Sequence, residues 1–182
     1  MAAEILSAKR LRELVHYDPD TGIFTWLARP KNSFSGPRSA AMWHTRYCGK
    51  RAGSLNKTLG YETIRLFGCT QLSHRMAWLY MTHEMPKNEV DHINGERADN
   101  RFCNLRDVSP QINKQNIRTA PRKREKLPLG VYRVTRDNLK KSFTASLSFN
   151  GRHIFLGYFL TEEEAHFAYV EAKRKWHAGC TI

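Results

Sequence analysis

The sequence Val-Asp-His-Ile-Asn-Gly at residues 90–95 constrains the fold of this chain more than any other part of it. Apolar residues bracket Asp91 and His92, as in a short strand, and the Asn-Gly pair predicts a turn because both residues tolerate positive φ. A second extended run follows at 105–108. Ser-Pro at 109–110 suits the N-cap and first position of a helix, which would carry Asn113. We therefore expect strand, loop, strand and helix in that order.

The polar side chains of this segment suit the hydrolysis of phosphodiester bonds. The carboxylate of Asp91 and the amide oxygen of Asn113 are hard ligands, suited to Mg²⁺ or Mn²⁺ and poor for zinc. Alternation along the strand turns His92 to the other side, where a neutral imidazole could take a proton from an attacking water. A bound metal ion would stabilise charge on the scissile phosphate and the leaving oxygen.

Residues 91–95 closely resemble the motif of HNH endonucleases of the phage homing type, together with the runs at 99–101, 104–106 and 113–116. These enzymes use a ββα-metal fold. The resemblance implies that His92 is the general base, that Asp91 and Asn113 bind the metal ion, and that Asn104 orients the loop and the histidine. Asn116 is a rival for the second ligand, because it lies one turn further along the helix.

Other parts of the first 118 residues are less specific. A helix is expected at 7–17, a strand at 23–27, a surface loop at 28–50, a strand at 61–67 and a helix at 74–83 capped by Ser73. The strand and helix before the motif resemble those of phage HNH proteins, so the resemblance spans residues 15–118. For His74 a place in the capping turn is favoured over contact with a phosphate. For Asp99 and Asn100 an Asx turn is as good an interpretation as a catalytic role.

Composition limits the class of partner and the compartment. The net charge of +13 and a pI near 9.9 indicate an anionic partner, and nucleic acid is the default for a protein without a membrane span. The first residues are too charged for a signal peptide, so we expect a cytoplasmic protein. The resemblance to phage HNH endonucleases implies that it is phage-encoded and acts in the host bacterial cell. The four scattered cysteines are expected to be reduced, part-buried thiols.

Basic residues gather after the motif. Residues 110–142 hold ten lysines and arginines against one glutamate and one aspartate. With prolines at 121 and 128, residues 119–128 are interpreted as a basic linker that lies along DNA phosphates and adds affinity without sequence preference.

The last part of the chain changes to a compact pattern. Strands are expected at 130–134, 143–149 and 153–159, with a hairpin turn at Asn150-Gly151. Thr161 and Glu164 form a capping box for a helix that reaches about residue 178. This unit resembles the plant APETALA/ethylene-response-factor DNA-binding domain, relatives of which are fused to phage HNH nucleases. The resemblance implies a three-stranded sheet in the major groove, although serine, histidine and aromatic residues stand where plant domains present arginines and tryptophans.

The sequence thus predicts an α+β protein in two parts. Residues 1–118 form an HNH nuclease domain with its ββα-metal core at 88–118 and an N-terminal strand and helix elaboration. Residues 119–128 form the linker, and 129–182 form a small three-stranded antiparallel sheet packed on one helix. The residues expected to contact DNA are Arg118, Arg122, Lys123, Arg124, Arg133, Arg136, Lys140, Lys141, Ser146, Ser148, Arg152, His153 and Phe155.

The predicted function is metal-dependent cleavage of double-stranded DNA by a homing-type endonuclease, as a monomer or homodimer. One site cuts one strand, so nicking is the simplest expectation. Two alternatives stay open. One is a non-catalytic DNA-binding regulator on an inactive nuclease scaffold, and the other is an RNA-directed or structural binding module.

Overall fold

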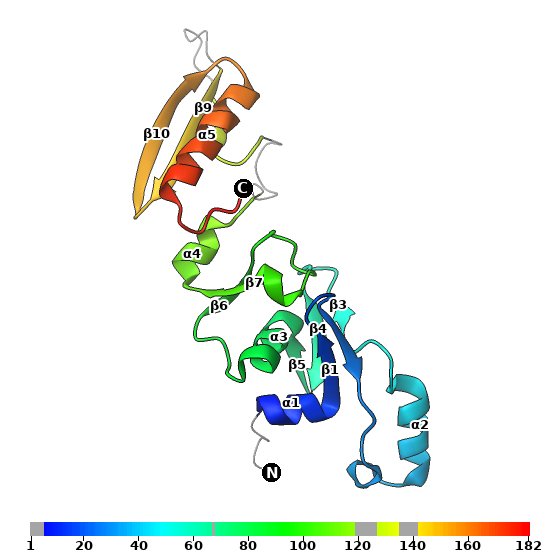
Figure 1. Cartoon of the computed structure of the whole chain (residues 1–182). Coiled ribbons are helices and arrows are strands. Elements are labelled where there is room, and N and C mark those ends of the chain that lie inside the picture. The colour runs from blue at the N-terminus through cyan, green and yellow to red at the C-terminus, as the bar shows by residue number, and fades with distance from the viewer. Residues whose placement is uncertain (1–5, 67, 119–126, 135–141) are drawn as a thin grey trace. The chain divides into compact units, whose positions relative to one another are not determined.

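A computed structural model describes residues 6–66, 68–118, 127–134 and 142–182 (Figure 1). The chain forms two compact units, Met1–Val108 and Ser109–Ile182. Each combines helices with small antiparallel sheets, which agrees with the predicted mixture of helices and strands and is compatible with an HNH domain. The domain limits drawn from the sequence stay a prediction.

The first unit begins with a helix and a hairpin. Helix α1 (Ala8–Leu14) is capped by Ser7 and is followed by strands β1 (Val15–Asp18) and β2 (Ile23–Trp26). The predicted helix to residue 17 is therefore too long. Residues 15–17 alternate between buried and exposed, with Val15 and Tyr17 in the core, and this period of two fits a strand paired with β2.

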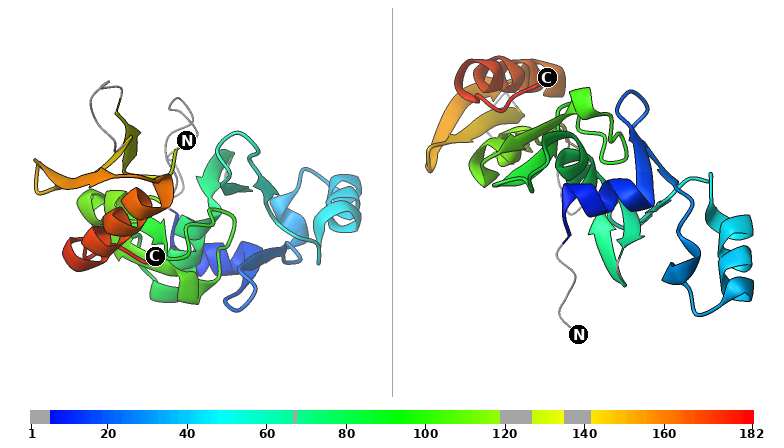
Figure 2. Two further views of the ribbon diagram at one scale, coloured as in Figure 1. Left: turned by 90° about the horizontal axis from the view of Figure 1, so that it is seen from above. Right: turned by 60° about the horizontal axis from the view of Figure 1, so that its bottom comes forward.

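The segment predicted as a loop at 28–50 contains two helices. A 3-10 turn, η1 (Lys31–Ser33), precedes helix α2 (Pro37–Tyr47), which stands apart from the other elements of the first unit (Figures 1 and 2). The prediction was wrong because α2 buries only Ala40 and so lacks a wide apolar stripe. Proline at the first helical position supports the start of the helix, and Trp43 packs edge-on against Trp26 at a ring distance of 6.0 Å.

The centre of the first unit is a three-stranded sheet covered by a helix. Strands β3 (Ser54–Leu55), β4 (Glu62–Leu66) and β5 (Cys69–Leu72) pair antiparallel in that order. Helix α3 (Ser73–Thr82) follows at once, and its N-cap is Leu72 rather than the predicted Ser73. The core joins these elements to α1 and β1 through buried apolar side chains, among them Leu11, Val15, Phe24, Ile64, Leu66, Met76 and Leu79.

The last elements of the first unit are the two strands on either side of the motif loop. Strand β6 (Glu89–His92) pairs antiparallel with β7 (Leu105–Val108), and a 3-10 turn, η2 (Phe102–Asn104), ends the loop between them. Gly95 has a φ of 77°, as the predicted turn requires. The apolar Val90 and Leu105 join the core and fix the register of this pair.

The second unit follows its local sequence signals closely. Helix α4 (Pro110–Gln115) is capped by Ser109, whose Oγ accepts from the Ile112 amide. Strands β8 (Val131–Arg133), β9 (Phe143–Phe149) and β10 (Arg152–Phe159) form a sheet in the order β10-β9-β8. Helix α5 (Glu162–Trp176) lies against this sheet, begins at the predicted Thr161 cap and ends two residues before the predicted end (Figures 1 and 2).

Candidate active site

The pairing of β6 with β7 fixes the two predicted catalytic side chains in buried positions. Asp91 lies opposite Arg106, and His92 lies opposite Leu105. Asp91 and His92 are 7% and 4% exposed. The Nε and Nη2 atoms of Arg106 donate to Asp91 Oδ2 at 2.9 and 2.7 Å, and this ion pair was not predicted from the sequence. The arginine fixes the orientation of the carboxylate next to the histidine.

Asn104 ties the two ends of the motif loop together. Its Oδ1 accepts from the Asn94 amide at 2.9 Å, and its Nδ2 donates to the Asp99 carbonyl at 2.8 Å. Its own carbonyl accepts from the amide of Ile93 at 2.8 Å. These contacts join the two ends of the loop, and the predicted role of Asn104 in the reaction stays a prediction. Asp99 braces the same loop by accepting from Asn94 Nδ2 at 2.7 Å, and hydrogen bonds from Arg101 are the main reason that its pKa is lowered to about 2.

A hydrogen-bonded chain reaches the imidazole of His92 from the sheet behind it. Asn100, only 1% exposed, donates from Nδ2 to Glu62 Oε2 at 3.0 Å, and its Oδ1 lies 3.4 Å from His92 Nε2. Arg51 donates to the other oxygen of Glu62 from Nε at 3.0 Å and from Nη2 at 2.9 Å, and a carboxylate in such an ion pair only accepts hydrogen bonds. The Asn100 amide must therefore turn its nitrogen to Glu62 and its oxygen to His92.

This orientation selects the tautomer of His92. Because Asn100 presents an oxygen, His92 Nε2 has to carry the proton and donate it. In the neutral ring the basic nitrogen is then Nδ1. From the sequence, an Asx turn and a catalytic role were equally good interpretations of Asn100. Glu62 was missed because it lies on β4, far from the motif in the chain.

The hairpin of β1 and β2 holds Asn100 in place. Tyr17 donates its hydroxyl to the Asn100 carbonyl at 2.6 Å, and burial is the main reason that the pKa of this hydroxyl is raised. Gly22 has a φ of 72°, and a Cβ at this position would lie 2.5 Å from the backbone of Asn100 and Arg101. Only glycine allows this close approach. The N-terminal elaboration thus forms part of the support of the site.

Two further rings surround His92. His74 packs edge-on against it at a centroid distance of 5.0 Å, and Tyr61 lies 5.2 Å from His74 and 6.0 Å from His92. His74 is 5% exposed, and burial, with smaller contributions from His92 and Arg75, lowers its pKa to about 3. His74 lies in the first turn of α3, which agrees with the favoured interpretation, and its ring is in addition buried beside His92.

Burial also lowers the pKa of His92, although the Asn100 hydrogen bond and the charge of Asp91 oppose the shift. The ring is therefore neutral at neutral pH, which is the form that can accept a proton.

The donor set of the first unit suits a hard cation that keeps most of its water. Asp91 supplies a carboxylate, and among the residues that the structure describes no group of three His, Cys, Asp or Glu side chains could hold a metal ion. Zinc sites need three or four such ligands, whereas Mg²⁺ binds through one or two carboxylates plus water and phosphate oxygens. Asp91 is the carboxylate of the motif that could contribute to such a site, and its role as a ligand stays a prediction.

Asn113, the predicted second ligand, lies on α4 and so belongs to the second unit, and its role stays a prediction. The rival Asn116 is the C-cap of α4 and is 6% exposed. Its Oδ1 accepts a hydrogen bond from Thr181 Oγ1, which gives it a structural task in the second unit.

The predicted DNA contacts have mixed outcomes. Ser148, Arg152, His153 and Phe155 are exposed, as expected. Ser146 was predicted to face outward but is 6% exposed, because the chain before β8 runs beside it and the Ser146 amide donates to the Gly130 carbonyl. The positions that lie outside the described residues are Arg122, Lys123, Arg124, Arg136, Lys140 and Lys141.

Two predicted arginine contacts have partners within the second unit. Arg118 Nη2 donates to the carbonyl and the hydroxyl of Thr181 at 2.9 and 2.6 Å. Arg133 is exposed and lies 3.9 Å from Glu162. The four cysteines are free thiols, but Cys69 and Cys103 are exposed rather than part-buried.

The match to a known family falls on the same segment as the site. The family model described as HNH endonuclease matches residues 71–115, from β5 through the motif loop to the end of α4. Residues 71–115 form an HNH endonuclease domain. HNH nucleases generally use divalent metal ions, and DNA is the substrate that this family implies. The HNH domain contains Asp91, His92, Asn100 and Asn104, whereas Tyr17, Gly22 and Glu62, which support its loop, precede it.

Two other comparisons add no relatives. No curated protein and no solved structure matches the chain significantly. Among the described residues, no helix is long and apolar enough to cross a membrane.

Proposed function

We propose that the chain is a metal-dependent DNA endonuclease of the homing type, in which His92 is the general base and Asp91 the metal ligand. The observation that carries the proposal is the hydrogen-bonded chain from Glu62 through Asn100 to His92 Nε2, next to the buried Asp91. A solvated hairpin does not need a buried amide that fixes the tautomer of its histidine. A general base does, because its lone pair has to point at the reacting water.

In the proposed reaction His92 Nδ1 takes a proton from a water molecule as its oxygen attacks the scissile phosphorus. The new phosphorus–oxygen bond forms as the bond to the 3′-oxygen breaks, and one strand is cut. Asp91 would hold the divalent ion, which stabilises the charge that develops on the phosphate and the leaving oxygen. Arg106 keeps the Asp91 carboxylate oriented. Asn104 keeps the loop between the strands closed.

The charge of the first unit supports DNA as the substrate. Residues 21–61 contain seven lysines and arginines and no acidic residue. Lys31, Arg38, Arg46, Lys50 and Lys57 in this stretch are exposed, several of them on or next to α2. Such a surface attracts phosphates without reading base sequence.

The second unit is proposed to add DNA contacts from its sheet. Arg152, His153 and Phe155 are exposed on β10, and Ser148 is exposed on the neighbouring strand. Among these four, Arg152 is the group that can pair with a phosphate, and the others can contact bases or sugars. The resemblance to ethylene-response-factor domains stays a proposal.

Replacing Glu62 with glutamine tests the tautomer argument. The oxygen of the new side-chain amide is expected to stay with Arg51 and its nitrogen to face Asn100. The Asn100 amide then turns over and presents its nitrogen to His92 Nε2. The ring then favours the tautomer with its proton on Nδ1, and the tautomer with a basic Nδ1 forms only at the cost of this hydrogen bond. We expect the single-turnover cleavage rate to fall about tenfold, which corresponds to about 1.4 kcal/mol and is the scale of one hydrogen bond.

The control for this variant is Glu84→Gln, because Glu84 is exposed and lies in the turn after α3. Its cleavage rate should equal that of the wild type. The ¹⁵N chemical shifts of His92 separate the two tautomers directly and do not respond to a loss of stability alone. A Glu62→Gln protein whose His92 keeps its proton on Nε2 would contradict the assignment.

Replacing His74 with phenylalanine tests the burial of a neutral ring beside His92. The native pKa of His74 is about 3 and its ordinary value is 6.5, so between these values the unfolded chain binds a proton that the native protein does not. Stability is therefore full above pH 6.5 and falls as the pH drops. When the pH drops from above 6.5 to about 5, the free energy of unfolding of the wild type should fall by about 2 kcal/mol more than that of His74→Phe.

Urea unfolding at both pH values measures this difference. His92 contributes to the pH dependence in both proteins and cancels in the comparison. His16→Phe is the control, because His16 is exposed on β1 and its replacement should leave the pH dependence unchanged. Equal pH dependence in wild type and His74→Phe would show that the His74 ring is protonated as easily in the folded protein as in the unfolded chain.

A further inference from the structure

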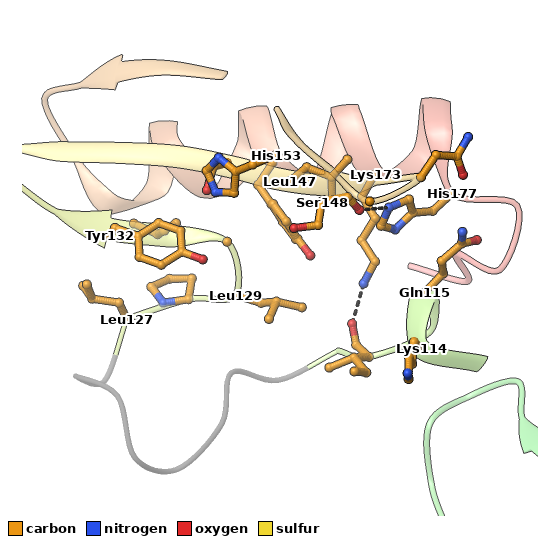
Figure 3. A pocket seen from close by; sticks show the side chains of 18 of the residues that line it. Lys114, Gln115, Leu127, Leu129, Tyr132, Leu147, Ser148, His153, Lys173 and His177 are labelled. Atoms are coloured by element: carbon orange, nitrogen blue, oxygen red, sulfur yellow. Dashed lines mark hydrogen bonds between the residues drawn. The ribbon is translucent and has the colours of Figure 1, made fainter. Parts of the chain in front are cut away.

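The second unit contains an open cavity of about 710 Å³ at the edge of its sheet (Figure 3). Its described lining residues all lie between 111 and 177, so it is separate from the site of Asp91 and His92. The cavity arises because β8 is short. Strand β8 pairs with β9 only as far as Ala145, which lies opposite Val131. After Ala145, β9 pairs with β10 along one edge. Residues of α4 and α5 line the space along its other edge.

One side of this cavity is apolar. Leu127, Leu129, Leu147 and the rings of Tyr132 and Tyr169 line it. Figure 3 shows Leu127 and Leu129 on the chain before β8 and Tyr132 in β8, and Lys173 reaching down from α5 nearer the other end of the cavity. The volume lies in the range of roughly 300–1,000 Å³ that is typical of pockets for small organic molecules.

The polar end of the cavity carries a buried positive charge, that of Lys173, and no salt bridge from Lys173 to a described carboxylate is found. Lys173 is 2% exposed, and its Nζ donates to the Ile117 carbonyl. No aspartate or glutamate is among the described residues that line the cavity, whereas Lys114, Arg133 and Lys173 are, and of these three Arg133 pairs with Glu162 outside the lining. Burial lowers the pKa of Lys173, so the protein bears the cost of a desolvated ammonium group there.

His177 stands one turn after Lys173 on the same face of α5. Its Nε2 lies 3.0 Å from the Ser148 carbonyl, so this nitrogen carries the proton and donates. Its Nδ1 is buried, and it has no hydrogen-bond partner among the described residues. A buried ammonium group without a carboxylate and a buried ring nitrogen without a partner thus lie together at the polar end of an otherwise apolar cavity.

We propose that this cavity binds a small organic anion, with an apolar or aromatic body against Leu127, Leu129 and Tyr132 and a carboxylate or phosphate on Lys173. The anion supplies the counter-charge that the lining lacks, and the leucine and tyrosine side chains bury the body of the ligand. The proposal does not depend on the nuclease assignment, because none of its residues belongs to the candidate active site.

The test compares matched probes on the full-length protein by calorimetry and by ¹H–¹⁵N NMR. 1-Naphthoate and 1-naphthyl phosphate carry the two anionic groups on one apolar body, 1-naphthol has the same body without a charge at neutral pH, and inorganic phosphate has the charge without the body. We expect at least one of the two acids to bind about tenfold or more tightly than both 1-naphthol and inorganic phosphate. The NMR shifts should change at residues 127–133, 146–148 and 173–177.

Lys173→Met keeps the length of the side chain and removes its charge, and it should abolish the preference for the acids. Lys175→Met is the control, because Lys175 is exposed on the same helix. Equal binding of 1-naphthol and both acids to the wild type, unaltered binding of the acids by a folded Lys173→Met protein, or no saturable binding of either acid would overturn the proposal. The wild-type comparison decides the question even if Lys173→Met does not fold.

Discussion

With His92 replaced by alanine, the single-turnover rate of duplex cleavage falls by about 10²- to 10⁴-fold, the usual contribution of a general base. The loss follows from the removal of the imidazole whose basic nitrogen is fixed at Nδ1 by Asn100. A short duplex labelled at one 5′ end, with enzyme in excess, isolates the chemical step from product release.

Binding of the duplex should change little in this variant, because His92 is 4% exposed and the proposed phosphate contacts lie elsewhere. The control is His16→Ala, which removes an exposed histidine from β1 and should cleave as the wild type does. Cleavage by His92→Ala at the wild-type rate, with metal ion present, would remove His92 from the mechanism.

The second large effect is expected for Asp91→Asn. Asparagine keeps the shape of the side chain but removes the charge that would hold a divalent ion and that pairs with Arg106. We expect cleavage in Mg²⁺ or Mn²⁺ to fall about 10²-fold or more, because the Lewis acid contributes several kcal/mol. The variant should also lose the stabilisation by metal ion, which in the wild type reaches about 2.7 kcal/mol at a metal concentration of about 100 Kd.

Thermal unfolding in Mn²⁺ and in chelator measures the stabilisation by metal ion independently of catalysis. Asp20→Asn, in the exposed turn after β1, is the control and should keep both activity and the metal-dependent shift. If Asp91→Asn is stabilised by metal ion as strongly as the wild type, the ion binds somewhere else.

The parts of the fold that were predicted correctly are those fixed by neighbouring residues. Asn150 and Gly151 have φ values of 50° and 75°, which is the hairpin turn expected of this pair. Ser109 and Thr161 cap their helices as predicted, because a cap depends on residues three positions apart. The pairing of β6 with β7 follows in the same way from apolar residues on either side of a turn.

The parts that were missed depend on residues far apart in the chain. Asn100 gains its role from Glu62 on β4, from the Tyr17 hydroxyl and from the close approach of Gly22, and no local pattern reports these contacts. The packing of His74 against His92 was missed for the same reason, since His74 lies on α3 and His92 on β6. Ser146 kept the alternation expected of a strand, but a neighbouring segment covers it.

The most direct test of the central claim is the conversion of supercoiled plasmid by the full-length protein in Mg²⁺, in Mn²⁺ and in chelator. The account predicts relaxed circles that accumulate with either metal ion and not with chelator, and linear product only after relaxed circles have formed. Tight, salt-sensitive binding of plasmids carrying host or phage DNA without any cleavage in either metal ion would contradict it, and would favour a DNA-binding regulator on an inactive HNH scaffold.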